Sequence, residues 1–161
     1  MVKQQVPFEE FLSSVDPVYQ DFVQGIHDYL MTNGCKATPE FKRSGYFVSY
    51  TDGKNKRAAV NFLFRKKGLI VRIYGTNAND YSDIIDSLPE NMTAAIQKSP
   101  DCKRLTGTAE CSPTCQMGND FLLNGERIQK CRINCFMFLV TPENNPHIQS
   151  FIEYEMTARL A

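Results

Sequence analysis

Clustered cysteines are the residues of this chain whose type and spacing could do chemistry. Five of its six cysteines lie in the segment 101–135. Four thiolates at tetrahedral corners can bind zinc with Zn–S distances of about 2.3 Å. Such a closed site stabilises a fold and leaves no coordination position for water or a substrate. The five cysteines are Cys102, Cys111, Cys115, Cys131 and Cys135.

Spacing along the chain selects four of these thiols as the predicted zinc ligands. Cys111 and Cys115 flank a Ser-Pro-Thr turn that can direct both sulfurs to one point. Cys131 and Cys135 are expected on one strand, where four residues span about 13 Å, too far to share a metal. Cys135 has apolar neighbours and is expected to be a buried core residue. The predicted structural zinc site is therefore Cys102, Cys111, Cys115 and Cys131.

Two other uses of the thiols stay open on the sequence alone. They could serve redox or disulfide chemistry, or they could be buried as small hydrophobic residues. An iron–sulfur centre is not indicated, because the spacing C-x8-C-x3-C-x15-C matches no recognised cluster pattern. Nearby basic residues would offset the negative charge of four thiolates. These are Lys103, Arg104, Lys130 and Arg132.

The second candidate site is a strongly basic segment, 42–72. Its nine basic residues and single acid, Asp52, give it a net charge of +8, whereas the rest of the neutral chain carries −8. A sheet face that presents cations and aromatic rings can hold phosphates and stack bases. The alternation of Phe62 and Phe64 with polar residues instead favours core positions for these rings and a solvated basic face. The residues predicted for anion or nucleic-acid binding are Arg57, Arg65, Lys66, Lys67 and Arg72.

Several functions are compatible with these two features. We favour a non-enzymatic, zinc-stabilised domain that binds an anionic ligand or a protein partner on the basic sheet. Nucleic-acid or nucleotide binding by the same segment is an alternative, and an enzyme of unknown class or a thiol redox protein is another. The sequence contains no GxGxxG, P-loop, GxSxG or HExxH pattern. His27 and His147 have no nucleophile or carboxylate partner close by in sequence that would indicate an active site.

Length and composition predict one globular domain. The chain has 161 residues, of which 42% are hydrophobic and 22% are charged, and these can form a single core over 1–161. No apolar run approaches the roughly 18 residues of a transmembrane helix, and the first residues do not have the pattern of a signal peptide. We therefore expect a cytoplasmic location without a membrane partner, where thiols stay reduced.

The first half of the chain predicts a helix followed by a β-meander. Asp16-Pro17 marks the start of the helix and Asn33-Gly34 its end. Three strands are expected at 46–50, 57–65 and 69–75. Short turns join these strands, so we expect them to pair in antiparallel fashion.

The second half predicts two short helices, a hairpin and a terminal helix. The short helices are expected at about 79–86 and between Pro89 and Pro100. Asn124-Gly125 predicts a hairpin turn that leads into a long strand, 128–140. The terminal helix starts near Asn145, with the buried stripe Ile148, Phe151, Ile152, Met156 and Leu160. The predicted fold is α+β: a single, mainly antiparallel sheet of about five strands, helices packed on one face, and a cysteine-rich zinc-binding hairpin.

Several stretches of the chain resemble proteins of an uncharacterised bacterial, cysteine-containing family. They read GCKATPEFKRSGYFVSY, NFLFRKKGLIVRIYG, CKRL, CSPTCQMGNDF and QKCR, and they span most of the chain. The order of helix, meander and terminal helix is also loosely similar to the YdhG-like domains of unknown function, some of which are linked to iron handling. This second similarity covers the first half only. Neither resemblance implies an activity or transfers a functional residue.

Overall fold

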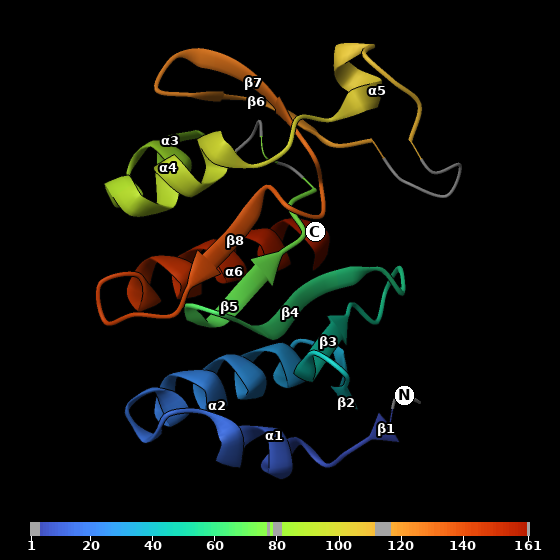
Figure 1. The fold of residues 1–161 in the computed structure, drawn as a ribbon, viewed down its shortest axis with the longest axis vertical. Coiled ribbons are helices and arrows are strands. Elements are labelled where there is room, and N and C mark those ends of the chain that lie inside the picture. The colour runs from blue at the N-terminus through green and yellow to red at the C-terminus, as the bar shows by residue number, and fades with distance from the viewer. Residues whose placement is uncertain (1–3, 77, 79–81, 112–116, 161) are drawn as a thin grey trace.

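A six-stranded antiparallel sheet and six helices form the part of the chain that the structure describes, residues 4–76, 78, 82–111 and 117–160 (Figure 1). In this computed structural model the strand order is β1-β2-β3-β4-β5-β8, and a separate hairpin pairs β6 with β7. The α+β class and the mainly antiparallel sheet are confirmed. The strands are β1 (Gln4–Gln5), β2 (Lys36–Lys42), β3 (Gly45–Thr51), β4 (Ala58–Arg65), β5 (Gly68–Ile73), β6 (Asn119–Leu123), β7 (Glu126–Lys130) and β8 (Phe136–Leu139). The helices are α1 (Phe8–Ser14), α2 (Pro17–Thr32), α3 (Ser82–Asp86), α4 (Glu90–Lys98), α5 (Lys103–Thr106) and α6 (Asn145–Leu160).

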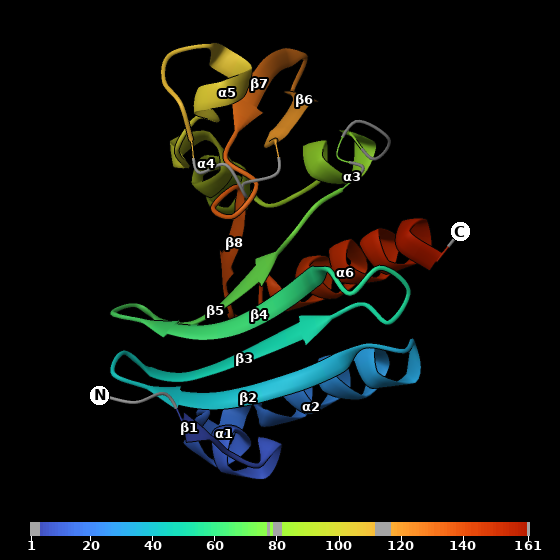
Figure 2. The ribbon, with the colours of Figure 1, turned by 90° about the vertical axis from the view of Figure 1, so that its right-hand side faces the viewer.

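The main core lies between one face of the sheet and the long helices. Figure 2 shows α2 and α6 behind strands β2 to β5, so the opposite face of these strands points toward the viewer. Alternate residues of the strands, such as Val48, Phe62 and Val71, are fully buried on the helix side. None of the helices is long and apolar enough to cross a membrane, as far as the described residues go.

Helix α2 has the boundaries that its sequence predicts. Asp16 caps it by accepting a hydrogen bond from the Val18 N–H at 3.1 Å, and Pro17 occupies its first turn. The chain leaves the helix at Asn33, and Gly34 follows with a φ of 85°, a left-handed conformation that glycine adopts without a steric penalty. These local signals suffice to define the helix that covers β2 and β3.

Strand β2 was not among the predicted elements. It pairs with β3 over its full length and with the two-residue β1 at its outer edge. Pro39 lies in the middle of β2, and a proline within a run argues against a strand unless that strand is at or near an edge. The neighbour of Pro39 on the outer side is Val6, whose N–H donates to the Pro39 carbonyl at 3.1 Å. The missing proline N–H is therefore tolerated here.

Five elements between β5 and β8 form a smaller lobe at the β8 edge of the sheet. Figures 1 and 2 both place α3, α4, α5 and the β6–β7 hairpin there. The predicted hairpin turn is confirmed, with φ angles of 51° at Asn124 and 80° at Gly125. The predicted continuous strand 128–140 is wrong. The chain turns at 131–135, where the Cys135 N–H donates to the Cys131 carbonyl at 2.9 Å, and this turn separates β7 from β8.

Helix α6 buries the predicted stripe except at its end. Ile148, Phe151, Ile152 and Met156 have no exposed surface, as expected, but Leu160 is 45% exposed. The buried residues of the last two turns also include two charged ones, Glu155 and Arg159. Because these two groups bind each other and the strand ends, the polar side of the helix turns inward there and Leu160 points to solvent.

Candidate functional site

The open face of the sheet, opposite the helices, carries polar side chains at its centre. Asn61 of β4 is the register partner of Ser49 on β3 and of Arg72 on β5. Partners in an antiparallel pair share a face, so these three side chains lie together. Asn61 is only 1% exposed although it lies on the strand face opposite the buried Phe62. The neighbouring side chains of this face therefore enclose it.

The amide of Asn61 holds Arg72 and Tyr74 in place. Its Oδ1 accepts hydrogen bonds from Arg72 Nη1 at 3.1 Å and from the Tyr74 hydroxyl at 2.8 Å. Its Nδ2 donates to the Val60 carbonyl at 3.0 Å and, more weakly, to Ser49 Oγ at 3.4 Å. A satisfied amide in the interior of a strand fixes the directions of both partners. The guanidinium and the phenol are thus pre-organised side by side on the open face.

Arg72 has an unused donor. Its Nε is buried and has no hydrogen-bond partner, and its Nη2 faces only the Met137 sulfur at 3.9 Å. No carboxylate within the described ranges forms an ion pair with this guanidinium. Leaving a buried donor of a charged group unsatisfied costs about 1–3 kcal/mol or more. An anion bound next to Arg72 would remove this penalty.

A small cavity of about 160 Å³ opens beside Arg72. Three cations line it, namely Lys42, Arg65 and Arg72, and its lining includes no carboxylate. Lys42 Nζ lies 4.0 Å above the centre of the Phe47 ring, which also lines the cavity. This cation–π contact orients the ammonium group without neutralising it. The cavity therefore has a positive lining and room for a compact anion.

The structure brings together only some of the predicted basic residues. Arg65 and Arg72 line the same cavity. Lys66 and Lys67 are exposed in the turn between β4 and β5, where their charge is in solvent. Arg57 is exposed just before β4, on the opposite side of Asn61 from Arg65.

Sequence reasoning missed the role of Asn61 on this face. It also missed the position of Arg132 near Arg159 and Tyr74. Asn61 could have been recognised in the sequence, because it is a polar residue inside the apolar strand AAVNFLF. The sequence gives no comparable signal for Arg132, because this residue lies in the turn 131–135, which was not predicted. Burial is the largest cause that lowers the pKa of its half-buried guanidinium, followed by the positive charges of Arg159 and Arg57, while Glu155 acts in the opposite direction.

The predicted metal ligands lie in the smaller lobe. Cys102 is 7% exposed and precedes α5, and its Sγ accepts a hydrogen bond from the Gly118 N–H at 3.3 Å. Burial works against ionisation of Cys102, but the N–H groups of Leu105, Gly118 and Arg104 and the Arg104 charge lower the pKa of this thiol below its ordinary value. Among the cysteines that the structure describes, Cys102 is therefore the one whose surroundings favour the thiolate.

Cys131 lies near Cys102 in the same ladder. Asp101 pairs with Lys130 in an isolated antiparallel bridge, and the Cys131 N–H donates to the Pro100 carbonyl at 2.8 Å. Because side chains alternate along each segment, Cys102 and Cys131 lie on the same side of this pairing. Cys131 Sγ also accepts a weak contact from the Asn134 amide at 3.6 Å.

The remaining cysteines of the segment differ in their surroundings. Cys111 is exposed, and Cys115 falls outside the described residues. Cys135 has no exposed surface, and burial strongly raises the pKa of its thiol. The strand-length argument for excluding Cys135 does not apply, because the chain turns between Cys131 and Cys135. Within the described residues no three His, Cys, Asp or Glu side chains are grouped so that they could hold a metal ion.

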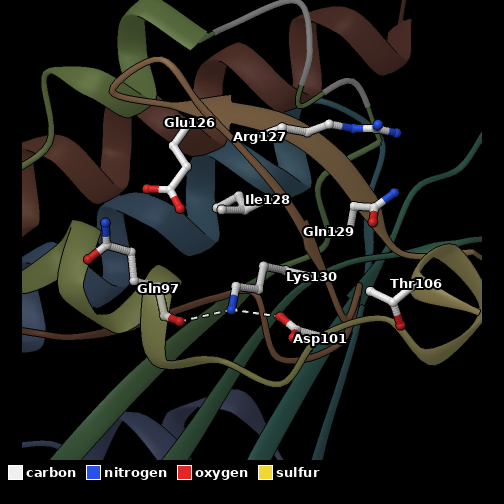
Figure 3. Close-up of a pocket in the computed structure, with 8 residues that line it drawn as sticks. All are labelled: Gln97, Asp101, Thr106, Glu126, Arg127, Ile128, Gln129 and Lys130. Atoms are coloured by element: carbon white, nitrogen blue, oxygen red, sulfur yellow. Dashed lines mark hydrogen bonds and ion pairs between the residues drawn. The ribbon is translucent and has the colours of Figure 1, made fainter. Parts of the chain in front are cut away.

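A larger cavity of about 450 Å³ lies between β7 and the end of α4. Figure 3 shows Lys130 at its centre, with its Nζ directed at the Gln97 carbonyl and at Asp101. Lys130 Nζ donates to these groups at 2.8 and 2.9 Å and to the Ser99 carbonyl at 3.0 Å. The Lys130 ammonium group thus has hydrogen-bond acceptors within the protein. Two of them are backbone carbonyls at the C-terminal end of α4, where a positive charge is favourable. This cavity offers no unsatisfied charged donor comparable with Arg72.

Comparison with known proteins gives no relative for this chain. It matches no protein-family model, and no curated protein or solved structure is significantly similar to it. The resemblance to uncharacterised bacterial proteins stays a prediction from the sequence.

Proposed function

We propose that this protein is a non-enzymatic binding domain whose open sheet face binds an anionic ligand at Arg72. The observation that supports the proposal is the buried Nε of Arg72, which lacks a partner beside a cavity lined by two further cations. A guanidinium presents its donors in a planar fork that suits phosphate or carboxylate oxygens. The lining residues supply no pair of nucleophile and general base, so binding is the chemistry that they favour.

The size and polarity of the cavity indicate the kind of ligand group. Its volume of about 160 Å³ equals roughly five water molecules at their volume in the liquid, which is enough for a phosphate-sized group. Phe47 and Leu63 add apolar walls that lower the local dielectric constant and strengthen the attraction between charges. A phosphate group with its remaining substituent toward solvent matches these features.

Titration with inorganic phosphate, followed by amide chemical shifts in NMR, tests this proposal. We expect shifts at β4 and β5 and an affinity about tenfold lower in the variant Arg72→Gln, which corresponds to the loss of roughly 1.4 kcal/mol. Asn61→Asp should weaken binding similarly, because a carboxylate in contact with Arg72 would compete with the ligand. Lys67→Gln removes the same charge in the exposed turn and serves as the control. Equal affinities of Arg72→Gln, Lys67→Gln and the unmodified protein would contradict the proposal.

We also propose that zinc stabilises the smaller lobe through Cys102, Cys111, Cys115 and Cys131, in a reducing cytoplasm. The supporting observation is the ring of N–H groups around Cys102 Sγ, since such donors favour the thiolate form that zinc requires. The thiolate of Cys131 on the same side of the ladder would be the second ligand.

Metal analysis of protein purified from zinc-replete cells without chelator tests this second proposal. We expect about one equivalent of zinc per chain, as for other structural sites. Protein that is folded and contains almost no zinc would contradict it.

A further inference from the structure

An apolar row of four side chains crosses the open face of the sheet beside the candidate anion site. Leu63 of β4 is the register partner of Phe47 on β3 and of Ile70 on β5. Ile70 is in turn the partner of Leu139 on β8. Partners in antiparallel strands share a face, so the four side chains form one line across four neighbouring strands. Leu63 is 3% exposed, but the other three keep part of their surface exposed, so the described chain leaves the apolar row partly uncovered.

Cations flank the apolar row on both sides. Side chains two residues apart on a strand point to the same face, so Arg65 and Arg72 share the face of Leu63 and Ile70. The register places Arg65 opposite Gly68 and Arg72 opposite Asn61, which are on the two sides of the Leu63–Ile70 pair. The apolar row is therefore bordered by positive charge, which favours a ligand that is both anionic and apolar.

The anion cavity lies near one end of the apolar row. Its lining includes Phe47 and Leu63 together with the three cations described above, whereas Ile70 and Leu139 lie outside it. Neighbouring strands are about 4.8 Å apart, so these two residues extend the row by about 10 Å from Leu63. In the other direction the register partner of Phe47 is Glu40 of β2, a buried carboxylate. A group bound in the cavity thus has an apolar path in one direction, toward Leu139.

We infer that the ligand is an amphiphilic phosphate monoester, with its phosphate in the cavity at Arg72 and its alkyl chain along the apolar row. This inference rests on the proposed anion site and names the class of ligand that fills it. The cations hold the phosphate, and the alkyl chain removes apolar surface of Ile70 and Leu139 from water. The ligand binds as a single dissolved molecule.

Two other occupants of the apolar row match the charges less well. A second copy of the chain would meet the row across a two-fold axis, which brings the same patch to both sides. Arg65 and Arg72 would then face cations of the other copy, and this repulsion disfavours such a dimer. An acidic helix of a partner protein would present carboxylates to the surface, whereas the free Nε of Arg72 is buried beside a cavity that suits a compact group.

NMR titrations with hexyl phosphate and with inorganic phosphate test the inference. One fully buried methylene adds about fourfold to affinity, so a chain buried on one side gains about twofold per carbon, and we expect hexyl phosphate to bind at least about tenfold more tightly. Hexyl phosphate should also shift amides of β8. Ile70→Thr and Leu139→Thr should each weaken hexyl phosphate about threefold and leave inorganic phosphate unchanged. Arg72→Gln should weaken both ligands.

Leu122→Thr is the matched control, because it makes the same kind of change at a 49% exposed leucine of β6, outside the apolar row. If hexyl phosphate binds the unmodified protein no more tightly than inorganic phosphate does, the inference is overturned, although phosphate binding at Arg72 still stands. The same holds if both row variants bind hexyl phosphate as Leu122→Thr does. If the unmodified protein binds neither ligand, the inference and the proposed function both fail.

Two further measurements address the other occupants. A dimer in analytical ultracentrifugation that Ile70→Thr and Leu139→Thr dissociate would assign the apolar row to a second copy and overturn the inference. Co-sedimentation with phosphatidate vesicles that the same two variants abolish would assign it to a bilayer, with the same consequence. Leu139→Thr, on the edge strand β8, keeps each test valid if Ile70→Thr does not fold.

Discussion

Arg159 and Asp52 form a buried ion pair between the last helix and the loop that joins β3 to β4. Arg159 Nη1 lies 2.8 Å from Asp52 Oδ2, and only 3% and 2% of the two side chains are exposed. Arg159 Nε donates to Glu155 at 2.7 Å, and Nη2 donates to the carbonyls of Ala58 and Tyr74 at 2.9 and 2.6 Å. One guanidinium thus connects α6 to the ends of β4 and β5, the strands that carry the open face.

Loss of this guanidinium should destabilise the whole domain. Arg159→Met keeps an unbranched apolar side chain but removes the guanidinium, and it leaves Asp52 and Glu155 as buried carboxylates without their cation. Breaking a buried pair in this way costs about 3–5 kcal/mol. Urea unfolding followed by circular dichroism measures the effect. Arg127→Gln, which breaks the exposed pair with Asp120, is the control and should change the unfolding midpoint only slightly. Similar midpoints for the two variants would contradict the structural role of Arg159.

His27 should make the domain less stable in mild acid. Its Nδ1 lies 2.7 Å from the hydroxyl of the buried Tyr50, and its ring stacks on Phe8 at 3.7 Å between centres. Burial lowers the pKa of His27, although the charges of Asp28 and Glu9 oppose the shift. Because the folded protein binds the proton less readily than the unfolded chain, the stabilisation is complete above the unfolded pKa of about 6.5. It is lost as the pH falls from there through the lower folded pKa.

The measurement for this histidine is the unfolding free energy between pH 8 and pH 5 in urea. His27→Gln should remove the part of the decrease that is due to His27, whereas His147→Gln, at the start of α6, should keep it. A decrease of the same size in all three proteins would show that other groups cause it.

Local signals in the sequence predicted helix α2 and the strands that pair with the next strand along the chain. Asp16-Pro17 and Asn33-Gly34 define α2, and the short turns define β3, β4 and β5. The turn at 131–135 was missed, because Cys131 to Leu139 reads as an uninterrupted β-rich run. A long-range requirement interrupts that run. After β7 the chain must leave the smaller lobe before β8 can pair with β5.

The candidate site was predictable only in part, for a related reason. The charge of segment 42–72 indicated Arg65 and Arg72, but a count of charges does not show which cations converge on one face. That selection depends on the register between β4 and β5, which places Arg72 against Asn61. The burial of Arg159 was also hidden, since a charged residue near a helix end is usually solvated.

The cysteines should differ in their response to chelation. If zinc is bound, a strong chelator should lower the melting temperature of the unmodified protein, because metal binding and folding are coupled. Cys102→Ser and Cys131→Ser should melt at the lower temperature with or without chelator. Cys35→Ser, which changes a buried cysteine outside the segment, is the control and should keep the response to chelator. A chelator effect that persists in Cys102→Ser would exclude this residue as a ligand.

Gly118 should tolerate no side chain, because three segments of the smaller lobe meet there. A Cβ atom on Gly118 would lie 2.8 Å from Cys102 Cβ and 3.1 Å from its Sγ, and it would overlap the carbonyl oxygen of Lys130. The backbone atom cannot move aside as a flexible side chain would, so Gly118→Ala should cost about 1–3 kcal/mol. It should also displace the N–H group that donates to Cys102 and thereby raise the pKa of that thiol, which alkylation rates at several pH values can measure.

Gly25→Ala is the matched control: no atom lies within 4 Å of the added carbon, and alanine within α2 should stabilise the domain by up to about 1 kcal/mol. If Gly118→Ala is as stable as Gly25→Ala and leaves the reactivity of Cys102 unchanged, the close packing of β6 against the Cys102 segment is wrong.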